Sequence, residues 1–304
     1  MGLATFIGGI HPYEGKELSE DKPIKYLEPL QGEVMVYPLS QHIGAPAKPL
    51  VAKGDHVLKG QIIAEAGGFI SANVLSSVSG TVKGIESKLV ANGAMVQSIL
   101  VENDGEEEAI EGFGTDRDAT KLSKEEIRKI VKDAGIVGLG GAGFPTHVKL
   151  TPKDENAIDY VIVNGAECEP YLNGDHLTMK NHPEELLKGI ELARIASGLD
   201  KAYYGIEKNK QDAIDLLLSK NPAQYGVEIV PENVKYPQGA EKMQIKAITN
   251  REVKPGGLPS GVGCNVISTQ TAYAIYRACY EGMPSIERVL TVAGSAMGDK
   301  SYNL

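Results

Sequence analysis

The second half of the chain alternates between short apolar runs and helical patterns, and this alternation restricts the possible folds more than any other feature. Apolar runs lie at 160–163, 202–206 and 227–230, with helical patterns between them at 183–198 and 211–219. A repeat of strand, helix and strand predicts a parallel sheet with crossover helices. We therefore expect an α/β fold that binds its ligands at the carboxyl ends of the strands.

The first half of the chain has a different pattern. Between residues 32 and 102, short β-branched runs alternate with glycines at regular spacing, which predicts a small all-β domain. The strings at 54–64 and 79–82 are similar to the sandwiched hairpins of biotinyl and lipoyl carrier domains. A carrier needs an exposed lysine at the hairpin tip, but residues 65–78 contain no lysine. We therefore expect a structural domain without a swinging arm.

An acidic, polar run at 102–108 marks the expected boundary between the two halves. Beyond it, Ser123 and Glu126 have the spacing of a capping box, in which each residue satisfies a backbone N–H group at the start of a helix. Apolar residues at helical spacing follow, up to Gly135. This pattern predicts a helix that begins after Ser123 and ends at Gly135.

A glycine-rich stretch at 138–149 follows this helix. Gly138, Gly140, Gly141 and Gly143 have neither the spacing of a phosphate-binding P-loop nor that of the dinucleotide fingerprint. Glycines allow positive φ angles and let a ligand lie directly on backbone N–H groups. We expect a cradle for a phosphorylated or planar cofactor. A tight structural turn is the alternative.

Composition excludes several classes of function. The 304 residues carry a formal net charge of −9, which argues against non-specific binding of nucleic acid. No stretch approaches the roughly 18 apolar residues of a membrane span, and the N-terminus lacks the basic region of a signal peptide, so we expect a cytoplasmic protein. Cys168, Cys264 and Cys279 form no C-x-x-C pair, so we expect neither an iron–sulfur cluster nor another metal site in this chain.

Four motifs occur in a fixed order along the second half of the chain. They lie at 138–149, 164–170, 236–242 and 256–259. Together they resemble the C subunit of the Rnf ferredoxin:NAD oxidoreductase, RnfC, and more distantly the flavin subunit of respiratory complex I. The strings at 8–12 and 41–46 also resemble RnfC, so the resemblance covers nearly the whole chain. It extends to the RnfC-like proteins associated with proline reduction in clostridia.

The resemblance implies an FMN held on the glycine loop, with NADH stacked on it. Glu169 and Lys149 are the implied catalytic residues, Glu169 at the nicotinamide and Lys149 near the flavin. The residues implied to bind the cofactor are Gly138, Gly140, Gly141, Gly143, Phe144, Lys149, Asn164, Glu167, Gly239, Glu241, Ser268 and Thr271. Ile267 and Ser268 stand where the family has an asparagine-containing run, but hydroxyl groups and the start of the helix expected at 272–280 still suit a phosphate.

The family continues into a soluble-ligand-binding-like (SLBB-like) β domain and a ferredoxin module with two cysteine quartets. The resemblance thus implies a barrel-sandwich hybrid domain at 1–105, a Rossmann-like FMN and NADH domain at 106–285, and the start of a truncated SLBB-like domain at 286–304. It implies an electron-transfer flavoprotein that exchanges hydride with NAD(H) and passes electrons to iron–sulfur centres of a partner or a missing segment. The implied partners are other subunits of an Rnf-like or proline-reductase-like system, with membrane contact only through them. A flavin-free docking module is the alternative.

Overall fold

The structure is a computed structural model that describes residues 3–152, 154, 157–294 and 302–303. Its contacts divide the chain into two compact units. We call the first the β unit, which contains residues 27–149 and 277–287. The second, the α/β unit, contains the described residues of 1–26, 150–276 and 288–304.

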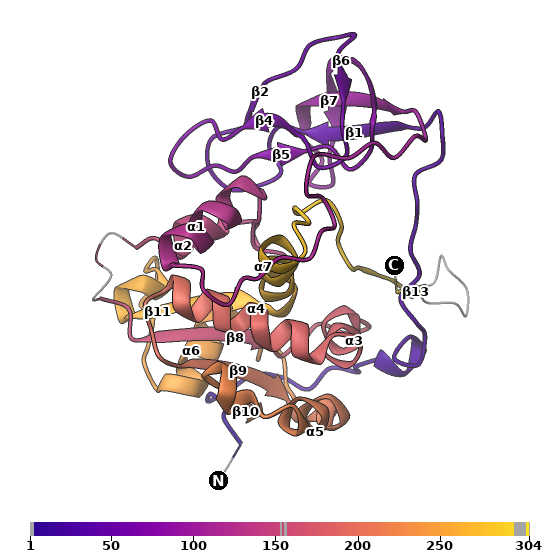
Figure 1. The fold of residues 1–304 in the computed structure, drawn as a ribbon. Helices are drawn as coiled ribbons and strands as arrows, with labels where there is room; N and C mark the ends of the chain where they lie inside the picture. The colour runs from indigo at the N-terminus through magenta and orange to yellow at the C-terminus, as the bar shows by residue number, and fades with distance from the viewer. Residues whose placement is uncertain (1–2, 153, 155–156, 295–301, 304) are drawn as a thin grey trace. The chain divides into compact units, whose positions relative to one another are not determined.

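The β unit is built from two small antiparallel sheets around one apolar core (Figure 1). One sheet has the order β1-β7-β6-β3 and the other the order β2-β4-β5. The strands are β1 (Val34–Pro38), β2 (Lys48–Pro49), β3 (His56–Val57), β4 (Ile62–Glu65), β5 (Val74–Leu75), β6 (Gly80–Leu89) and β7 (Met95–Asn103). Side chains from both sheets, such as Val57, Ile63 and Ile99, are fully buried in the shared core.

Helix α1 (Lys124–Asp133) of the β unit confirms the capping box. The Ser123 side chain accepts a hydrogen bond from the Glu126 N–H, and the Glu126 carboxylate accepts one from the Ser123 N–H at 2.8 Å. Ile127 and Val131 are buried on the apolar side of this helix. The short helix α2 (Thr146–Lys149) follows the glycine loop.

The α/β unit contains a four-stranded parallel sheet in the order β10-β9-β8-β11. Its strands are β8 (Tyr160–Gly165), β9 (Ala202–Glu207), β10 (Val227–Glu232) and β11 (Cys264–Ser268). The first three confirm the predicted strands, because long apolar runs bounded by turns form buried parallel strands. The sequence pattern did not identify β11.

Helices cover this sheet on its two faces (Figure 1). They are α3 (Gly174–Asn181), α4 (Pro183–Ala196), α5 (Gln211–Ser219), α6 (Glu241–Thr249) and α7 (Thr269–Tyr280). Ile245 of α6 packs on Ile162 of β8 in the core of one face. Helix α4 contacts strands β8, β9 and β10. The sequence pattern did not indicate helices α3 and α6, and α3 has no marked apolar face.

The N-terminal segment belongs to the α/β unit, whereas the resemblance implies a β domain that begins at residue 1. Ala4 forms a bridge with Glu232 at the end of β10, and Ile10 forms one with Tyr236. The 3₁₀ turn η1 (Lys16–Leu18) follows. The expected boundary near residue 105 also differs from the observed division, because residues 106–149 pack with the β unit. Both differences arise from long-range contacts, which local patterns do not record.

Few described residues belong to the expected SLBB-like segment. Strands β12 (Thr291–Val292) and β13 (Tyr302–Asn303) pair antiparallel. Residues 295–301 and 304 lie outside the described part of the chain.

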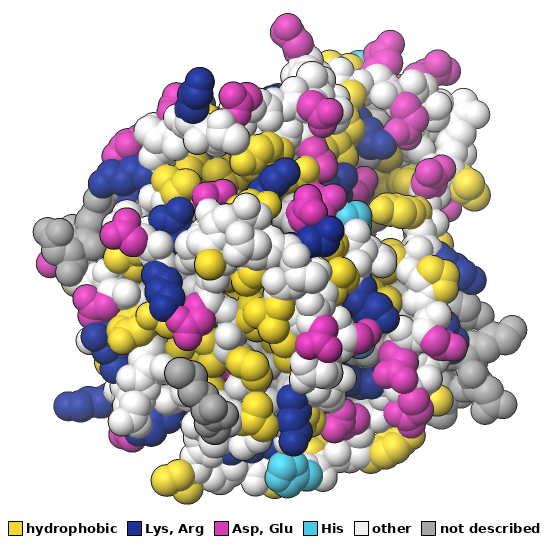
Figure 2. All heavy atoms as spheres, turned by 60° about the horizontal axis from the view of Figure 1, so that its bottom comes forward, with side chains coloured by type: hydrophobic (Ala, Val, Ile, Leu, Met, Phe, Trp, Pro, Cys, Tyr) yellow, Lys and Arg dark blue, Asp and Glu magenta, His cyan; other side chains and the backbone are white. Residues whose placement is uncertain are grey.

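No helix among the described residues is long and apolar enough to cross a membrane. Figure 2 shows Lys and Arg side chains interspersed with Asp and Glu over the face drawn.

Candidate functional site

The predicted ligand-binding edge of the parallel sheet lies where the order of the strands reverses. Strands β8, β9 and β10 follow one another in one direction, and β11 then pairs on the other side of β8. Asn164 at the end of β8 and Ser268 at the end of β11 are register partners. Open α/β sheets bind ligands at such a switch point. The fold thus brings two of the predicted cofactor residues together at the expected edge.

Asn164 connects the loop after β8 with the loop after β10. Its Nδ2 atom donates a hydrogen bond to the Gly239 carbonyl oxygen at 2.6 Å, and its Oδ1 atom accepts one from the Ala166 N–H at 3.2 Å. The Gly239 N–H donates to Cys168 Sγ at 3.1 Å, and a Cβ atom on Gly239 would lie only 3.2 Å from that sulfur. Asn164 and Gly239 therefore contact each other, and glycine allows the close approach.

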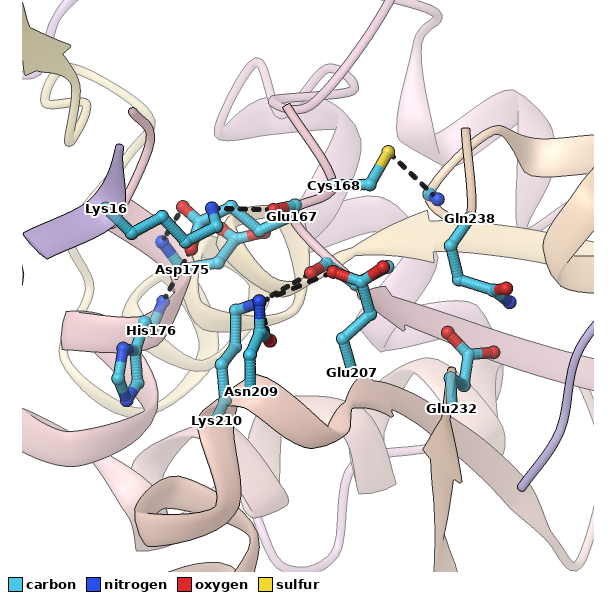
Figure 3. Close-up of polar contacts among 12 residues, drawn as sticks. Lys16, Glu167, Cys168, Asp175, His176, Glu207, Asn209, Lys210, Glu232 and Gln238 are labelled. Atoms are coloured by element: carbon cyan, nitrogen blue, oxygen red, sulfur yellow. Dashed lines mark hydrogen bonds and ion pairs between the residues drawn. The ribbon is translucent and has the colours of Figure 1, made fainter. Parts of the chain in front are cut away.

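The Glu167 side chain caps helix α3. Glu167 has a left-handed backbone (φ 49°) and is only 9% exposed. Its Oε1 atom accepts a hydrogen bond from the Asp175 N–H at 2.8 Å, and its Oε2 atom accepts one from the His176 N–H at 3.3 Å (Figure 3). A carboxylate at a helix start satisfies N–H groups that have no partner within the helix and interacts favourably with the helix dipole. Both oxygens of Glu167 are thus engaged within the protein.

Burial beside Glu167 changes the titration of Asp175. Burial raises the pKa of the Asp175 carboxyl, and the nearby Glu167 carboxylate raises it further. A neutral Asp175 avoids the repulsion between two buried carboxylates.

Glu169, two residues after Glu167, has a side chain in a different environment. Its side chain is exposed, and its carboxylate has no hydrogen-bond or ion-pair partner among the residues that the structure describes. Of the two predicted carboxylates in this loop, Glu169 is therefore the one available to an incoming ligand.

Two buried lysines hold the carbonyl groups of the same loop (Figure 3). Lys210 Nζ donates to the Ala166 carbonyl oxygen at 2.6 Å and lies 3.8 Å from Glu207 Oε2. Lys16 Nζ donates to the carbonyl oxygens of Glu167, Glu169 and Leu172. Neither lysine is among the site residues predicted from the sequence. Lys210 follows β9 and could have been found by listing charged residues at strand ends, whereas Lys16 has no local signal.

Two buried carboxyls lie side by side at the ends of β9 and β10. Glu207 and Glu232 are register partners. Burial raises the pKa of Glu207 to about 7 and that of Glu232 to about 8. Glu232 Oε1, both amide atoms of Gln238 and Gln244 Oε1 have no hydrogen-bond partner within the described chain. Figure 3 shows the side chains of Glu232 and Gln238 pointing toward one another.

A small cavity of about 30 Å³ adjoins these groups within the α/β unit. Glu207, Asn209 and Cys168 line it on one side, and the N-terminal segment lines it with charged and polar residues that include Glu14 and Lys16. Burial raises the pKa of the Cys168 thiol to about 11, so this thiol is not a nucleophile at neutral pH.

The glycine loop lies in the β unit and forms a closed hairpin. Val137 pairs with Pro145, and the Gly138 N–H donates to the Phe144 carbonyl oxygen at 2.9 Å. Gly143 has a φ of 67°, and a Cβ atom on it would lie 3.2 Å from the Gln41 carbonyl oxygen. Gly143 thus confirms the expectation of positive φ.

The tip of the hairpin is open. Gly140 and Gly141 are exposed, and a Cβ atom on Gly141 would meet nothing within 4 Å. Gly138 and Gly141 do not adopt the left-handed conformation, so these two positions do not use the conformational freedom that glycine allows. Lys149 is the last residue of α2, the short helix that follows the loop. The backbone at the tip is therefore accessible to a planar ligand.

Ser268 caps helix α7, which begins at Thr269 and not at residue 272 as predicted. Its Oγ atom accepts a hydrogen bond from the Thr271 N–H at 3.2 Å and lies 2.9 Å from Thr271 Oγ1. Both hydroxyl groups stand at the start of a twelve-residue helix, where an anion is favoured. Glu241 opens helix α6, one residue after the loop that contains Gly239.

Two family models match the chain. The model described as the RnfC barrel sandwich hybrid domain matches residues 4–106, and the model described as the Nuo51 FMN-binding domain matches residues 131–277. The second range contains every predicted cofactor residue, from Gly138 to Thr271.

Solved structures support the fold alone. A chain of an NAD⁺-reducing [NiFe]-hydrogenase, solved in the H₂-reduced state, superposes with a TM-score of 0.52 at 23% identity. The match covers 62% of this chain and 38% of the hydrogenase chain.

Curated relatives are more similar in sequence than these solved structures, and their matches cover nearly the whole chain. The chain is 43% identical over 295 residues to the C subunit of the proton-translocating ferredoxin:NAD(+) oxidoreductase complex of Clostridium ljungdahlii, a match that covers 97% of this chain. It is also 43% identical over 296 residues to the C subunit of the Na(+)-translocating ferredoxin:NAD(+) oxidoreductase complex of Acetobacterium woodii, a match that covers 96% of it. The chain spans 64% and 66% of the lengths of these two relatives. Together with the four ordered motifs and the two-part architecture, these matches show that the chain belongs to the RnfC family.

Proposed function

We propose that this chain is an electron-transfer flavoprotein component that binds FMN and exchanges hydride with NAD(H). The observation that carries the proposal is the exposed tip of the glycine loop within the range matched by the FMN-binding family model. Because a Cβ atom on Gly141 would meet nothing, the backbone there leaves room for a flat ring system. The residues present therefore fit an FMN cofactor.

We assign the predicted cofactor residues to two tasks. The glycine loop with Phe144 holds the flavin ring, and Lys149 supplies positive charge to it. Ser268 and Thr271 supply hydroxyl groups, and the start of α7 supplies a favourable dipole, for the phosphate. When bound, FMN converts between hydride exchange and the transfer of single electrons.

Glu169 is assigned to the nicotinamide. Its free carboxylate is suited to accept a hydrogen bond from the carboxamide of NAD(H), and such a charge-assisted bond orients the ring. Asn164, Glu167 and Gly239 have a supporting task in this proposal, because their polar groups bind one another and the start of α3. Glu241 lies at the start of α6, two residues after Gly239.

We further propose that electrons leave the chain for iron–sulfur centres elsewhere. The three cysteines are free and buried, and no group of metal-ligating residues occurs in the described part of the chain. The relatives are named as subunits of ion-translocating oxidoreductase complexes, so other subunits of such a complex, or of a proline-reductase-like system, are the proposed partners. Membrane contact then occurs through these partners.

The test begins with the cofactor. The purified chain, reconstituted with FMN or FAD, is expected to retain FMN, identified by its absorbance spectrum and by the mass of the released molecule. NADH added without oxygen is expected to bleach the flavin absorbance. Retention of FAD contradicts the cofactor assignment. A colourless protein that binds no flavin at micromolar concentration favours the flavin-free docking module.

A further inference from the structure

We propose that Lys16 is a positioning residue of the NAD(H) site: its ammonium group acts as a fixed internal cation that sets the backbone of the 166–172 loop and thereby the direction of Glu169. This proposal rests on the proposed function. It also gives the N-terminal segment a task that its position in the sequence does not suggest.

The contacts of Lys16 are those of a caged cation (Figure 3). Its Nζ atom donates to the carbonyl oxygens of Glu167 at 2.8 Å, Glu169 at 3.2 Å and Leu172 at 2.6 Å. An ammonium group has three N–H bonds, so each has an acceptor. The residue is only 8% exposed, and water therefore contributes little to its solvation.

The loop around Lys16 needs such a cation. Glu167 and Tyr171 are both left-handed, with φ angles of 49° and 71°, although neither is glycine. A left-handed conformation at residues other than glycine costs free energy and persists only when the surrounding structure stabilises it. This path also turns three carbonyl oxygens toward one point, where their negative partial charges repel each other. The ammonium group converts this repulsion into attraction.

Hydrogen bonds also fix the N-terminal segment around the backbone of Lys16. The Asn173 Nδ2 atom donates to the Lys16 carbonyl oxygen at 2.8 Å and to Ser19 Oγ at 2.8 Å. The Tyr171 N–H donates to the Glu14 carbonyl oxygen at 2.7 Å. The backbone of Lys16 and its ammonium group are therefore both attached to the same loop.

Burial and nearby charges of both signs act on the Lys16 ammonium group. Burial lowers the pKa of Lys16, and the Glu167 carboxylate opposes this effect. Lys210 lowers the pKa of Lys16 further, while Glu207 and Glu14 raise it. Three acidic side chains and a second lysine thus act on Lys16.

Lys16 acts on Glu169 through the backbone. Its ammonium group holds the Glu169 carbonyl oxygen, while the Glu169 side chain is exposed and has no partner among the described residues. The orientation of that side chain is set mainly by the backbone from which it extends. Loss of the cation should therefore change how NAD(H) binds more than whether flavin binds.

The main test compares Lys16→Met with Lys22→Met. Lys22 lies in the same segment, and its ammonium group donates to the nearby Leu18 carbonyl oxygen instead of to the 166–172 loop, so it is a matched control. Hydrogen–deuterium exchange of the amides in 164–173 is expected to accelerate at least about tenfold in Lys16→Met and to stay at the parent rate in Lys22→Met. In FMN-loaded protein, the NADH concentration for half-maximal flavin reduction should rise about 10- to 100-fold in Lys16→Met with flavin occupancy unchanged.

Chemical rescue separates a caged cation from simple packing. In Lys16→Ala, n-propylammonium should restore slow exchange in 164–173 and tight NADH binding, whereas tetramethylammonium, which cannot donate hydrogen bonds, should not.

If Lys16→Met does not fold, Lys16→Gln serves in the exchange experiment, because it keeps two donors without the charge. Parent-like exchange and NADH dependence in a folded Lys16 variant, or no difference between the two cations, would overturn the proposal. If NADH does not reduce the parent flavoprotein, the proposed function fails, and the exchange data still decide whether Lys16 sets the loop.

Discussion

Glu167 and Glu169 are separated by one residue, yet the first carboxylate is buried against the start of helix α3 and the second is exposed without a partner in the described structure. Replacement by glutamine should therefore lower the stability of the chain at position 167 and slow the reduction of the flavin at position 169.

Glu169→Gln is expected to retain flavin and to slow its reduction by NADH about 10- to 100-fold, because a charge-assisted hydrogen bond of roughly 1.5–3 kcal/mol is lost. Flavin occupancy and anaerobic stopped-flow reduction, measured on the same preparation, check this. Parent-like reduction would mean that NADH does not bind beside Glu169.

Glu167→Gln is expected to lower the free energy of unfolding by about 0.5–2 kcal/mol, because a helix cap and its charge are weakened. Urea denaturation measures this difference. Glu169→Gln is the matched control and should unfold at the parent urea concentration. Equal stability of all three proteins would contradict the capping role of Glu167.

Two glycines of the glycine loop should respond differently to a side chain. Gly141→Val is expected to fold as the parent does, since a Cβ atom there meets nothing within 4 Å, and to lose flavin because the side chain covers the exposed backbone. Gly143→Val is expected to destabilise the flavin-free protein itself, because φ is 67° and the Cβ atom would crowd the Gln41 carbonyl oxygen.

Thermal unfolding of the flavin-free proteins and flavin titration distinguish these two outcomes. Normal flavin binding by Gly141→Val would show that the tip of the loop is not the cradle.

Because Asn164 donates a hydrogen bond to Gly239, replacing the side-chain nitrogen of Asn164 by oxygen should lower the stability of the chain. In Asn164→Asp, a carboxylate oxygen replaces the amide nitrogen that donates to the Gly239 carbonyl oxygen at 2.6 Å. Two acceptors then face each other, so Asn164→Asp should be less stable than Asn164→Ala, which only removes the bond. Urea denaturation at pH 7 checks the order of stability, and the reverse order would contradict the bridging role.

The raised pKa of Glu232 should make the free energy of unfolding depend on pH. Its pKa is raised by burial to about 8 in the folded chain, whereas an unfolded glutamate titrates near 4.5. Between these two values the folded state holds a proton that the unfolded state has released, so stability falls as the pH rises from about 4.5 to 8. The slope from this group is at most about 1.4 kcal/mol per pH unit.

Glu232→Gln should remove this part of the pH dependence and be more stable than the parent at pH 8. Glu232 Oε1 and Gln244 Oε1 would both lie within 2.7 Å of a Cβ atom on Gly205, so the two oxygens approach the same point. A neutral acid or an amide can supply the donor that two such oxygens lack. Denaturation curves at pH 5, 6.5 and 8 test this, and parallel pH profiles for the two proteins would contradict it.

Local patterns were sufficient for most of the framework. Apolar runs at 160–163, 202–206 and 227–230 predicted strands β8, β9 and β10, and Ser123 with Glu126 predicted the start of α1. These features depend on residues within a few positions of one another, where backbone sterics, capping and periodicity act directly. Helix α3 was missed because its sequence lacks a clear apolar face, and the nine-residue helix α6 was missed as well.

The motifs that follow strands β8 and β10 lie at the predicted ligand-binding edge, because the carboxyl ends of parallel strands lie together whatever the loops do. Asn164 and Ser268 could therefore be named from sequence and resemblance. Only the tertiary structure decided how the polar atoms are used. It engages Glu167 with α3, leaves Glu169 exposed, and brings Lys16 to a loop about 150 residues away. Such contacts depend on the path of two irregular segments through space, and no local periodicity encodes that path.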